Sequence, residues 1–222
     1  MGTNSHIKVA IDGPSGAGKS TVAKRIASAI GADYIDTGAM YRAVALKLLR
    51  CGIDPESEPE RLSDMLSTTT VDFRSGSTLL DGQDVTGEIR TPEVTAMASA
   101  SSALRQIREK LVELQREMGR SKSVVMDGRD IGTNVFPDAE CKFYMTASAE
   151  ERARRRFAEL SAAGARDSYA DVLAAIEKRD YDDSHRALNP LVRAEDAILI
   201  DTDGIGIEDV TDNMLAYIES LL

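Results

Sequence analysis

The sequence predicts an α/β fold in which a five-stranded parallel sheet is flanked by helices in three layers. First, five short apolar segments alternate with stretches of helical periodicity, a pattern typical of parallel sheets. Second, a glycine-rich loop joins the first apolar segment to the first helical one. Third, polar turns follow the strands at Asp12-Gly13, Asp36-Thr37-Gly38 and Asp127-Gly128-Arg129-Asp130. Because ligands of open α/β sheets bind at the carboxyl ends of the strands, we expect the functional site there.

The glycine-rich loop fits the nucleotide-binding pattern G-x-x-x-x-G-K-[S/T] of the P-loop. Its glycines allow backbone N–H groups to turn inward and form a concave nest for phosphate oxygens. Lys19 can reach the outer phosphates of ATP or GTP, and the Ser20 hydroxyl can bind Mg²⁺. The helix that follows adds partial positive charge at its N-terminus. We expect these residues to contact the nucleotide phosphates: Gly13, Pro14, Ser15, Gly16, Ala17, Gly18, Lys19, Ser20 and Thr21.

The remaining segments follow in the order that this fold requires. Apolar runs predict strands at 7–11, 33–38, 123–128, 141–145 and 197–202. Helical periodicity, with a stop signal at Gly52, predicts helices at 20–30, 39–50, 60–67, 92–118 in two pieces, 148–163, 168–181 and 207–221. The acidic, proline-containing stretch 53–61 predicts a loop, and residues 1–6 are expected to be a flexible leader.

A small antiparallel β insertion interrupts the alternation. Residues 68–74 alternate at period 2, residues 78–80 follow a turn, and Asp81-Gly82 is a hairpin signal. We expect residues 85–90 to form a third strand. The chain is then one domain, 1–222, with a core of residues 7–60 and 119–222, a short helical lid near 152–168, and an insertion at 61–118.

Composition excludes several classes of partner. The formal net charge of −10 at pH 7 argues against nucleic acid polymers and anionic membranes, because both require a basic face. No apolar run reaches the ~18 residues of a membrane span, and the N-terminus lacks the apolar core of a signal peptide. Cys51 and Cys141 are far apart in sequence and are expected to be free thiols of a cytoplasmic protein.

One strand-end loop carries charges suited to phosphoryl transfer, which needs alignment and positive charge more than covalent help. Asp127 ends a strand, where its carboxylate can hold Mg²⁺ directly or through water, or can serve as a cap. Arg129 follows, and it can grip a phosphate with two hydrogen bonds or form a surface ion pair with Asp130.

Two helical segments are also rich in charge. The segment 148–163 has four arginines within five positions: Arg152, Arg154, Arg155 and Arg156. Most should form i,i+4 pairs with acids, while one or two, Arg155 among them, are expected to close over the ATP phosphates. Farther on, Arg179, Asp183 and Arg186 recur at helical spacing, which suits an acid that accepts from a ribose hydroxyl beside cationic donors. The neighbouring His185 is expected to be inert.

Five segments together resemble the bacterial cytidylate kinase family, and the resemblance covers roughly residues 7–220. These segments are the loop 13–20, Asp36-Thr37-Gly38-Ala39-Met40-Tyr41-Arg42, Gly87-Glu88-Ile89-Arg90-Thr91, the run 127–133 with 135–139, and 179–186. The resemblance implies a monomer that transfers the γ-phosphate of ATP to CMP or dCMP with Mg²⁺. It also implies that the insertion binds the nucleoside monophosphate.

The resemblance further implies roles for individual residues. Lys19, Arg129 and Arg179 are expected to be catalytic, and Ser20 with Asp127 to bind the metal. Residues expected to bind the acceptor are Thr37, Tyr41, Arg42, Ser99, Arg108, Arg129, Asp130, Arg179, Asp183 and Arg186. Among these, Asp183 would take the ribose hydroxyls and Asp130 would accept from the cytosine amino group. Uracil has a carbonyl at that position, so it would leave Asp130 mismatched.

Two other functions are compatible with the phosphate loop. A kinase of another small acceptor, such as a different nucleotide or shikimate, is disfavoured by the combination of Asp130 with Arg186. A switch GTPase or an ATPase motor is the second alternative. Switch GTPases usually carry an N-K-x-D guanine-binding run, and no asparagine in this sequence begins one.

Overall fold

The computed structural model describes residues 6–74 and 76–221. The chain divides into two compact units, one formed by Met1–Tyr34 with Ser121–Leu222 and the other by Ile35–Arg120. Apart from His6, the expected leader lies outside the described residues. The predicted insertion 61–118 falls within the second unit, and its boundaries, like those of the lid, remain predictions.

The strands and helices follow the predicted order with few exceptions. The strands are β1 Lys8–Asp12, β2 Asp33–Asp36, β3 Val71–Arg74, β4 Ser77–Leu80, β5 Gln83–Asp84, β6 Val124–Gly128, β7 Cys141–Thr146 and β8 Ile198–Asp201. The helices are α1 Lys19–Ile30, α2 Thr37–Cys51, α3 Pro59–Ser67, α4 Pro92–Ser101, α5 Arg105–Met118, α6 Ala149–Ala162, α7 Tyr169–His185 and α8 Ile207–Glu219, with short helical turns η1 Glu88–Arg90 and η2 Ile131–Val135. None of the helices in the described part of the chain is both long and apolar enough to span a membrane.

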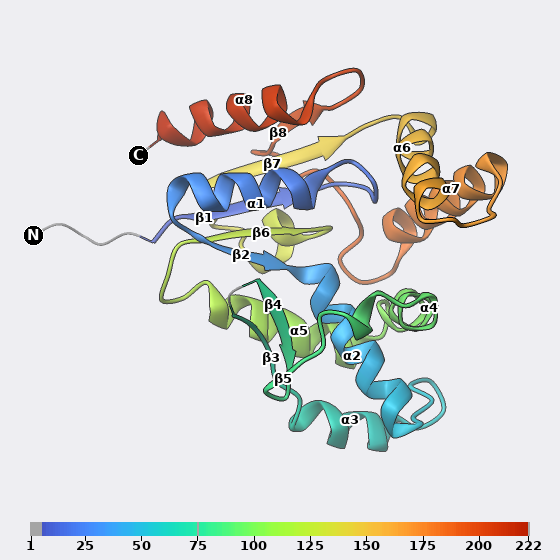
Figure 1. Cartoon of the computed structure of the whole chain (residues 1–222). Coiled ribbons are helices and arrows are strands. Elements are labelled where there is room, and N and C mark those ends of the chain that lie inside the picture. Colours follow the sequence, from blue (N-terminus) through green and yellow to red (C-terminus); the bar gives the residue numbers. More distant parts are fainter. Residues whose placement is uncertain (1–5, 75, 222) are drawn as a thin grey trace, which may run out of the picture. The chain divides into compact units, whose positions relative to one another are not determined.

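The first unit is built on the predicted five-stranded parallel sheet, whose strand order is β2-β6-β1-β7-β8. The central strand β1 pairs in parallel with β6 and β7, which aligns Asp12 with Gly128 and with Tyr144. Helices α1 and α8 lie along one face of this sheet (Figure 1). Their apolar sides pack on alternate strand residues, as Ile26 of α1 and Met214 of α8 share a buried core with Phe143. This packing fixes the end of β1 and the start of α1, where the phosphate loop lies.

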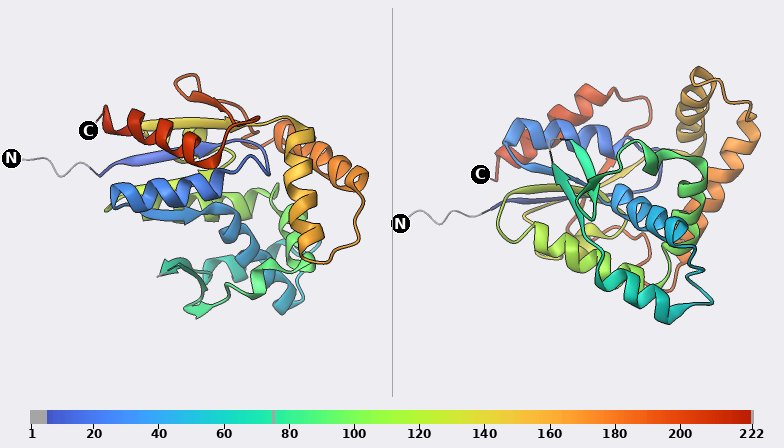
Figure 2. Two further views of the ribbon diagram at one scale, coloured as in Figure 1. Left: turned by 45° about the horizontal axis from the view of Figure 1, so that its top comes forward. Right: turned by 60° about the horizontal axis from the view of Figure 1, so that its bottom comes forward.

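Helices α6 and α7 lie side by side in the same unit (Figure 2). Ala153, Val172 and Ile176 form the buried contact between them. The Ser168 hydroxyl accepts a hydrogen bond from the Asp171 backbone N–H, which caps the start of α7. Helix α7 continues to His185 rather than ending at the predicted residue 181.

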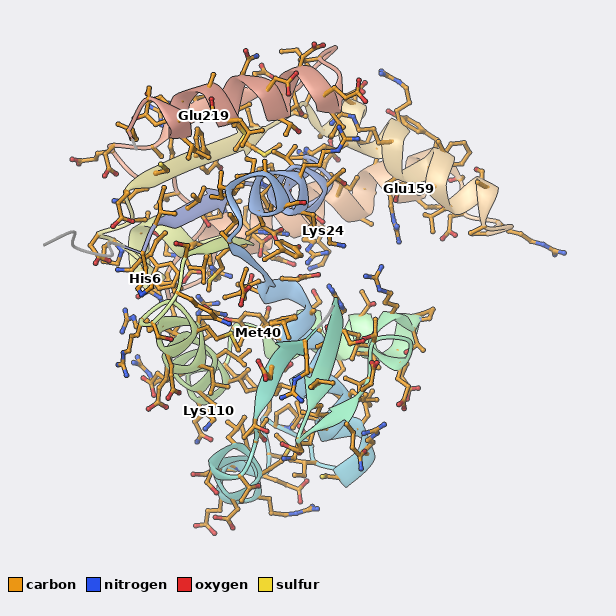
Figure 3. The ribbon with its side chains drawn as sticks, turned by 60° about the vertical axis from the view of Figure 1, so that its left-hand side comes forward. His6, Lys24, Met40, Lys110, Glu159 and Glu219 are labelled. Carbon is orange, nitrogen blue, oxygen red and sulfur yellow. The ribbon has the colours of Figure 1, made fainter. Side chains whose placement is uncertain are left out.

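The second unit contains α2, α4 and a three-stranded antiparallel sheet in the order β3-β4-β5. Met40, labelled in Figure 3, is fully buried on α2. The prediction of a third strand at 85–90 was wrong. The third strand is the two-residue β5, and the Val85 carbonyl then accepts from the backbone N–H groups of Glu88 and Ile89, which closes a helical turn. Burial of Val85 and Ile89 stabilises this turn, so their apolar character did not indicate a strand.

Candidate active site

The phosphate loop of the first unit has the backbone that its glycines predict. Gly13, Gly16 and Gly18 all have positive φ angles, of 144°, 81° and 87°, which side chains other than glycine rarely adopt. A Cβ atom on Gly13 would also collide with the Met145 carbonyl oxygen of β7. The loop therefore turns tightly between β1 and α1 and lies against the neighbouring strand.

Lys19, at the first position of α1, points its side chain back into this loop. Its Nζ donates to the Pro14 carbonyl oxygen at 2.7 Å, and the residue is only 5 % exposed. Burial lowers the pKa of Lys19 well below its usual value, and the nearby Arg129 guanidinium lowers it further. An anion close to Nζ would oppose both effects and favour the charged ammonium.

Ser20 and Asp127, the two residues predicted to bind metal, are in contact. Ser20 Oγ donates to Asp127 Oδ2 at 2.9 Å, and the Tyr34 hydroxyl donates to Asp127 Oδ1 at 2.8 Å. Lys24, labelled in Figure 3, places its ammonium 5.5 Å from the centre of the Tyr34 ring. Two oxygen donors, from α1 and from the end of β6, are thus held together beside the phosphate loop.

Arg129, directly after β6, pairs with Asp183 near the end of α7. Arg129 Nε donates to Asp183 Oδ2 at 2.7 Å. Burial alone would raise the pKa of Asp183, but the guanidinium groups of Arg129 and Arg179 hold that pKa below its usual value. Asp183 is therefore an ionised acceptor at neutral pH, and the structure brings these three predicted residues together in one charged group.

Asp130 and Arg186 form a second pair in the same unit. Arg186 Nη2 lies 3.3 Å from Asp130 Oδ1, and each side chain is only 9 % exposed. Helix α7 ends at His185, and the backbone of Arg186 is extended. Arg186 still lies beside Asp183, as the spacing predicted, because its Nη1 is 3.9 Å from Asp183 Oδ1. Its Nε donates to the Asn189 carbonyl oxygen at 2.7 Å, which fixes the guanidinium. His185 stacks on the Tyr181 ring at 4.0 Å between ring centres and is exposed.

Asp12 is a buried carboxylate that sequence reasoning did not identify. It ends β1, and its two oxygens accept from the backbone N–H groups of Ile131 and Gly132 at 2.8 and 2.7 Å. Burial raises the pKa of Asp12 to about 6 despite these two hydrogen bonds. Asp12 thus fixes the segment that follows Asp130. In the sequence, Asp12 stood out only as part of the polar turn Asp12-Gly13 before the phosphate loop, and this position did not indicate its role.

The arginines of α6 have different environments. Arg152 is 4 % exposed; its guanidinium donates to both oxygens of Asp180, at 3.0 and 2.6 Å, and to the Ser15 carbonyl oxygen at 3.1 Å. Arg155, predicted to contact ATP, donates to Glu151 and to the Thr202 carbonyl oxygen, the latter at 2.7 Å. Arg154 and Arg156 form i,i+3 ion pairs on the surface.

The second unit holds Arg42, which the resemblance assigns to the acceptor phosphate. Its Nη2 lies 3.4 Å from Asp36 Oδ2, and Gly38 leaves room for the guanidinium because a Cβ there would lie 3.1 Å from Nη1. Among the residues that the structure describes, Arg42 Nε is buried without a hydrogen-bond partner. Buried donors are nearly always satisfied, so this nitrogen is a donor that a bound anion would satisfy.

The other predicted residues of the second unit lie on three helices. Thr37 begins α2 and is buried, and the ring of Tyr41 on the same helix lies 5.9 Å from the Arg108 guanidinium carbon. Arg108, on α5, is 2 % exposed and donates to the Ser102 carbonyl oxygen at 3.4 Å. Ser99 is exposed on α4.

Comparisons with known proteins agree with these observations. The family model described as cytidylate kinase matches residues 9–220. The chain is 51 % identical to a cytidylate kinase of Desulforamulus reducens, over 96 % of this chain and 97 % of that protein. It is 49 % identical to a cytidylate kinase of Caldicellulosiruptor bescii, over 94 % of each chain. It also matches 41 % of a bifunctional pantoate ligase/cytidylate kinase of Synechococcus elongatus, at 50 % identity over 93 % of this chain.

Solved structures support the fold alone. A shikimate kinase of Bacteroides thetaiotaomicron superposes with a TM-score of 0.51 at 15 % identity, covering 96 % of this chain and 98 % of that one. An uncharacterised protein of Eubacterium ventriosum gives 0.55 at 14 % identity, covering 97 % of this chain and 99 % of that one. The fold is therefore shared with a shikimate kinase. The family model and the sequence relatives are more specific, and they show that the chain belongs to the cytidylate kinase family.

Proposed function

We propose that the residues described above carry out the phosphorylation of CMP and dCMP by ATP, the activity of the cytidylate kinase family. The observation that carries this proposal is the juxtaposition, in the first unit, of the phosphate loop with the pairs Arg129–Asp183 and Arg186–Asp130. Phosphoryl transfer requires positive charge around the transferred group and fixed alignment of its partners. These residues offer both, from the loop after β1, the loop after β6 and the C-terminal end of α7.

The phosphate loop would bind ATP. Its inward N–H groups and the α1 N-terminus would hold the phosphates, and Lys19 would stabilise the charge of the transferred phosphoryl group. The buried position of Lys19 excludes water, which strengthens its interaction with an anion. Arg129 and Arg179 would act with Lys19 at the same group. Arg155 and other arginines near 152–168 remain candidates for a lid over ATP.

Mg²⁺ fits the donor set at Ser20 and Asp127. A hydroxyl and a carboxylate oxygen 2.9 Å apart are hard donors of the kind that Mg²⁺ prefers. In the described part of the chain, no group of three His, Cys, Asp or Glu side chains could hold a metal. Ser20 and Asp127 would hold Mg²⁺, which when bound would neutralise charge on the phosphates.

The acceptor nucleotide would be recognised by its three chemical parts. Arg42, with its buried Nε, and Arg129 are each proposed to bind the acceptor phosphate. Asp183, ionised at neutral pH, would accept from the ribose hydroxyls. Asp130 would accept from the cytosine amino group, and Arg186 would hold that carboxylate in place.

The test is ADP release from ATP and Mg²⁺ with a panel of acceptors: CMP, dCMP, UMP, AMP, GMP and shikimate. We expect turnover of CMP and dCMP with UMP far behind, because cytosine presents an amino donor to Asp130 where uracil presents a carbonyl. Turnover of shikimate or a purine nucleotide, or hydrolysis of ATP without transfer, would refute the proposal. Sedimentation of the same sample would test the expected monomer.

A further inference from the structure

Asp130 is held at both carboxylate oxygens by side chains of its own unit. Asn134 Nδ2 donates to Oδ2 at 3.0 Å, and Arg186 Nη2 lies 3.3 Å from Oδ1. A carboxylate accepts hydrogen bonds but cannot donate, so the Asn134 amide must turn its NH₂ group toward Asp130. Asp130 is thus presented as an oriented acceptor.

Asn134 can reach Asp130 because of the unusual turn η2. The Asp130 carbonyl oxygen accepts from the backbone N–H groups of both Asn134 and Val135, at 2.9 and 3.1 Å. Asp12 fixes the start of the same turn through the N–H groups of residues 131 and 132. Asn134 therefore donates to both the backbone carbonyl and the side-chain carboxylate of Asp130. These two hydrogen bonds leave the Asp130 carboxylate little rotational freedom.

This arrangement has a consequence for the choice of base. An oriented acceptor matches the amino group of cytosine and opposes the carbonyl of uracil, but a carboxylate that can rotate or hold a proton discriminates less. We propose that Asn134 is a specificity-determining positioning residue, whose amide keeps Asp130 an acceptor for cytosine. This inference rests on the base-reading role proposed for Asp130.

The experiment compares kcat/KM for CMP and for UMP in Asn134→Asp, Asn134→Ala and Asp130→Asn. Asn134→Asp keeps the size of the side chain but sets two carboxyl groups about 3 Å apart, where their repulsion, or a proton that they share, turns the Asp130 carboxylate away from its fixed orientation. We expect the CMP-to-UMP ratio to fall about tenfold or more in both Asn134 variants, as for loss of a hydrogen bond to a charged group. KM for ATP should not change. Asn213→Asp, on the exposed side of α8, is the matched control and should keep the ratio.

The outcomes separate this inference from the function on which it rests. If Asp130→Asn lowers the ratio and the Asn134 variants do not, Asn134 has no role in specificity and the inference is overturned alone. If Asp130→Asn leaves the ratio unchanged, the base-reading role fails, and the inference fails with it. A loss of rate with CMP and UMP in equal proportion would make Asn134 merely structural and would also overturn the inference.

Discussion

Two arginines, Arg152 in the first unit and Arg42 in the second, differ in how the protein satisfies their hydrogen-bond donors. In the first unit, Arg152 donates to a carboxylate and two carbonyl oxygens, and Lys19 donates to the Pro14 carbonyl oxygen. In the second unit, Arg42 keeps a buried Nε without a partner among the described residues. Both kinds of arginine look the same in a sequence, since each is one basic residue on an amphipathic helix.

This difference separates arginines that hold other protein groups in place from an arginine that is expected to bind a ligand. A buried guanidinium whose donors are matched by the protein holds its partners in place, and removing it leaves those partners unsatisfied. An unmatched buried donor costs stability until a ligand accepts from it. Substitutions of matched arginines should therefore reduce stability, whereas substitution of Arg42 should reduce activity.

The largest loss of stability is expected for Arg152→Leu. Removing the Arg152 guanidinium leaves the Asp180 carboxylate and the Ser15 carbonyl oxygen without this donor. We expect the free energy of unfolding to fall by about 3 kcal/mol, the lower end of the range for buried pairs, because the Asp180 side chain is still 28 % exposed. Urea denaturation measures this. An unchanged midpoint would show that the Arg152 contacts are not stabilising.

Arg42→Ala should produce the opposite pattern. We expect kcat/KM for CMP to fall about 100-fold, as for loss of a donor to a reacting anion, with the KM for ATP and the urea midpoint almost unchanged. Arg50→Ala is the control, since Arg50 forms a surface ion pair with Glu88 in the same unit. A large loss of stability in Arg42→Ala, with CMP kinetics intact, would remove the distinction between the two classes of arginine.

Ionised Asp12 should destabilise the folded protein, so stability should rise as the pH falls. A carboxylate held in an ion pair has the opposite effect, because it stabilises the fold when it is ionised. The pKa of Asp12 is raised from 3.8 to about 6, so the folded protein binds more protons than the unfolded chain between these values. Its unfavourable contribution is therefore present above pH 6 and is relieved as pH falls. We compare the unfolding free energy of the unsubstituted protein with that of Asp12→Asn. As the pH falls from 7 to 4, we expect the unsubstituted protein to gain about 2 kcal/mol relative to the variant. A pH-independent difference would contradict the raised pKa.

The smallest effect is expected for Arg154→Ala. Arg154 is an exposed neighbour of Arg152 on α6, and its ion pair with Glu151 lies at the surface. Such pairs contribute about 0.5 kcal/mol or less. If Arg154→Ala were as destabilising as Arg152→Leu, burial would not be what distinguishes these arginines.

The sequence could predict features that are encoded in contiguous residues, namely the phosphate loop and the strands of the parallel sheet. The metal role predicted for Ser20 and Asp127 rests on two such local patterns, and the structure brings the two side chains into contact across 107 residues. The role of Asp12 could not be predicted, since its partners are 119 and 120 residues away. Spacing likewise could not distinguish Arg152 from Arg154, because the packing of α6 on α7 decides which is buried.

The most direct test is calorimetric titration of CMP and of ATP into the protein and into Asp130→Ala. If Asp130 accepts a hydrogen bond from the cytosine amino group, CMP affinity should fall at least about tenfold in Asp130→Ala. ATP affinity should not change, because this role of Asp130 concerns the cytosine base alone. An equal loss for both nucleotides, or no loss for CMP, would contradict it.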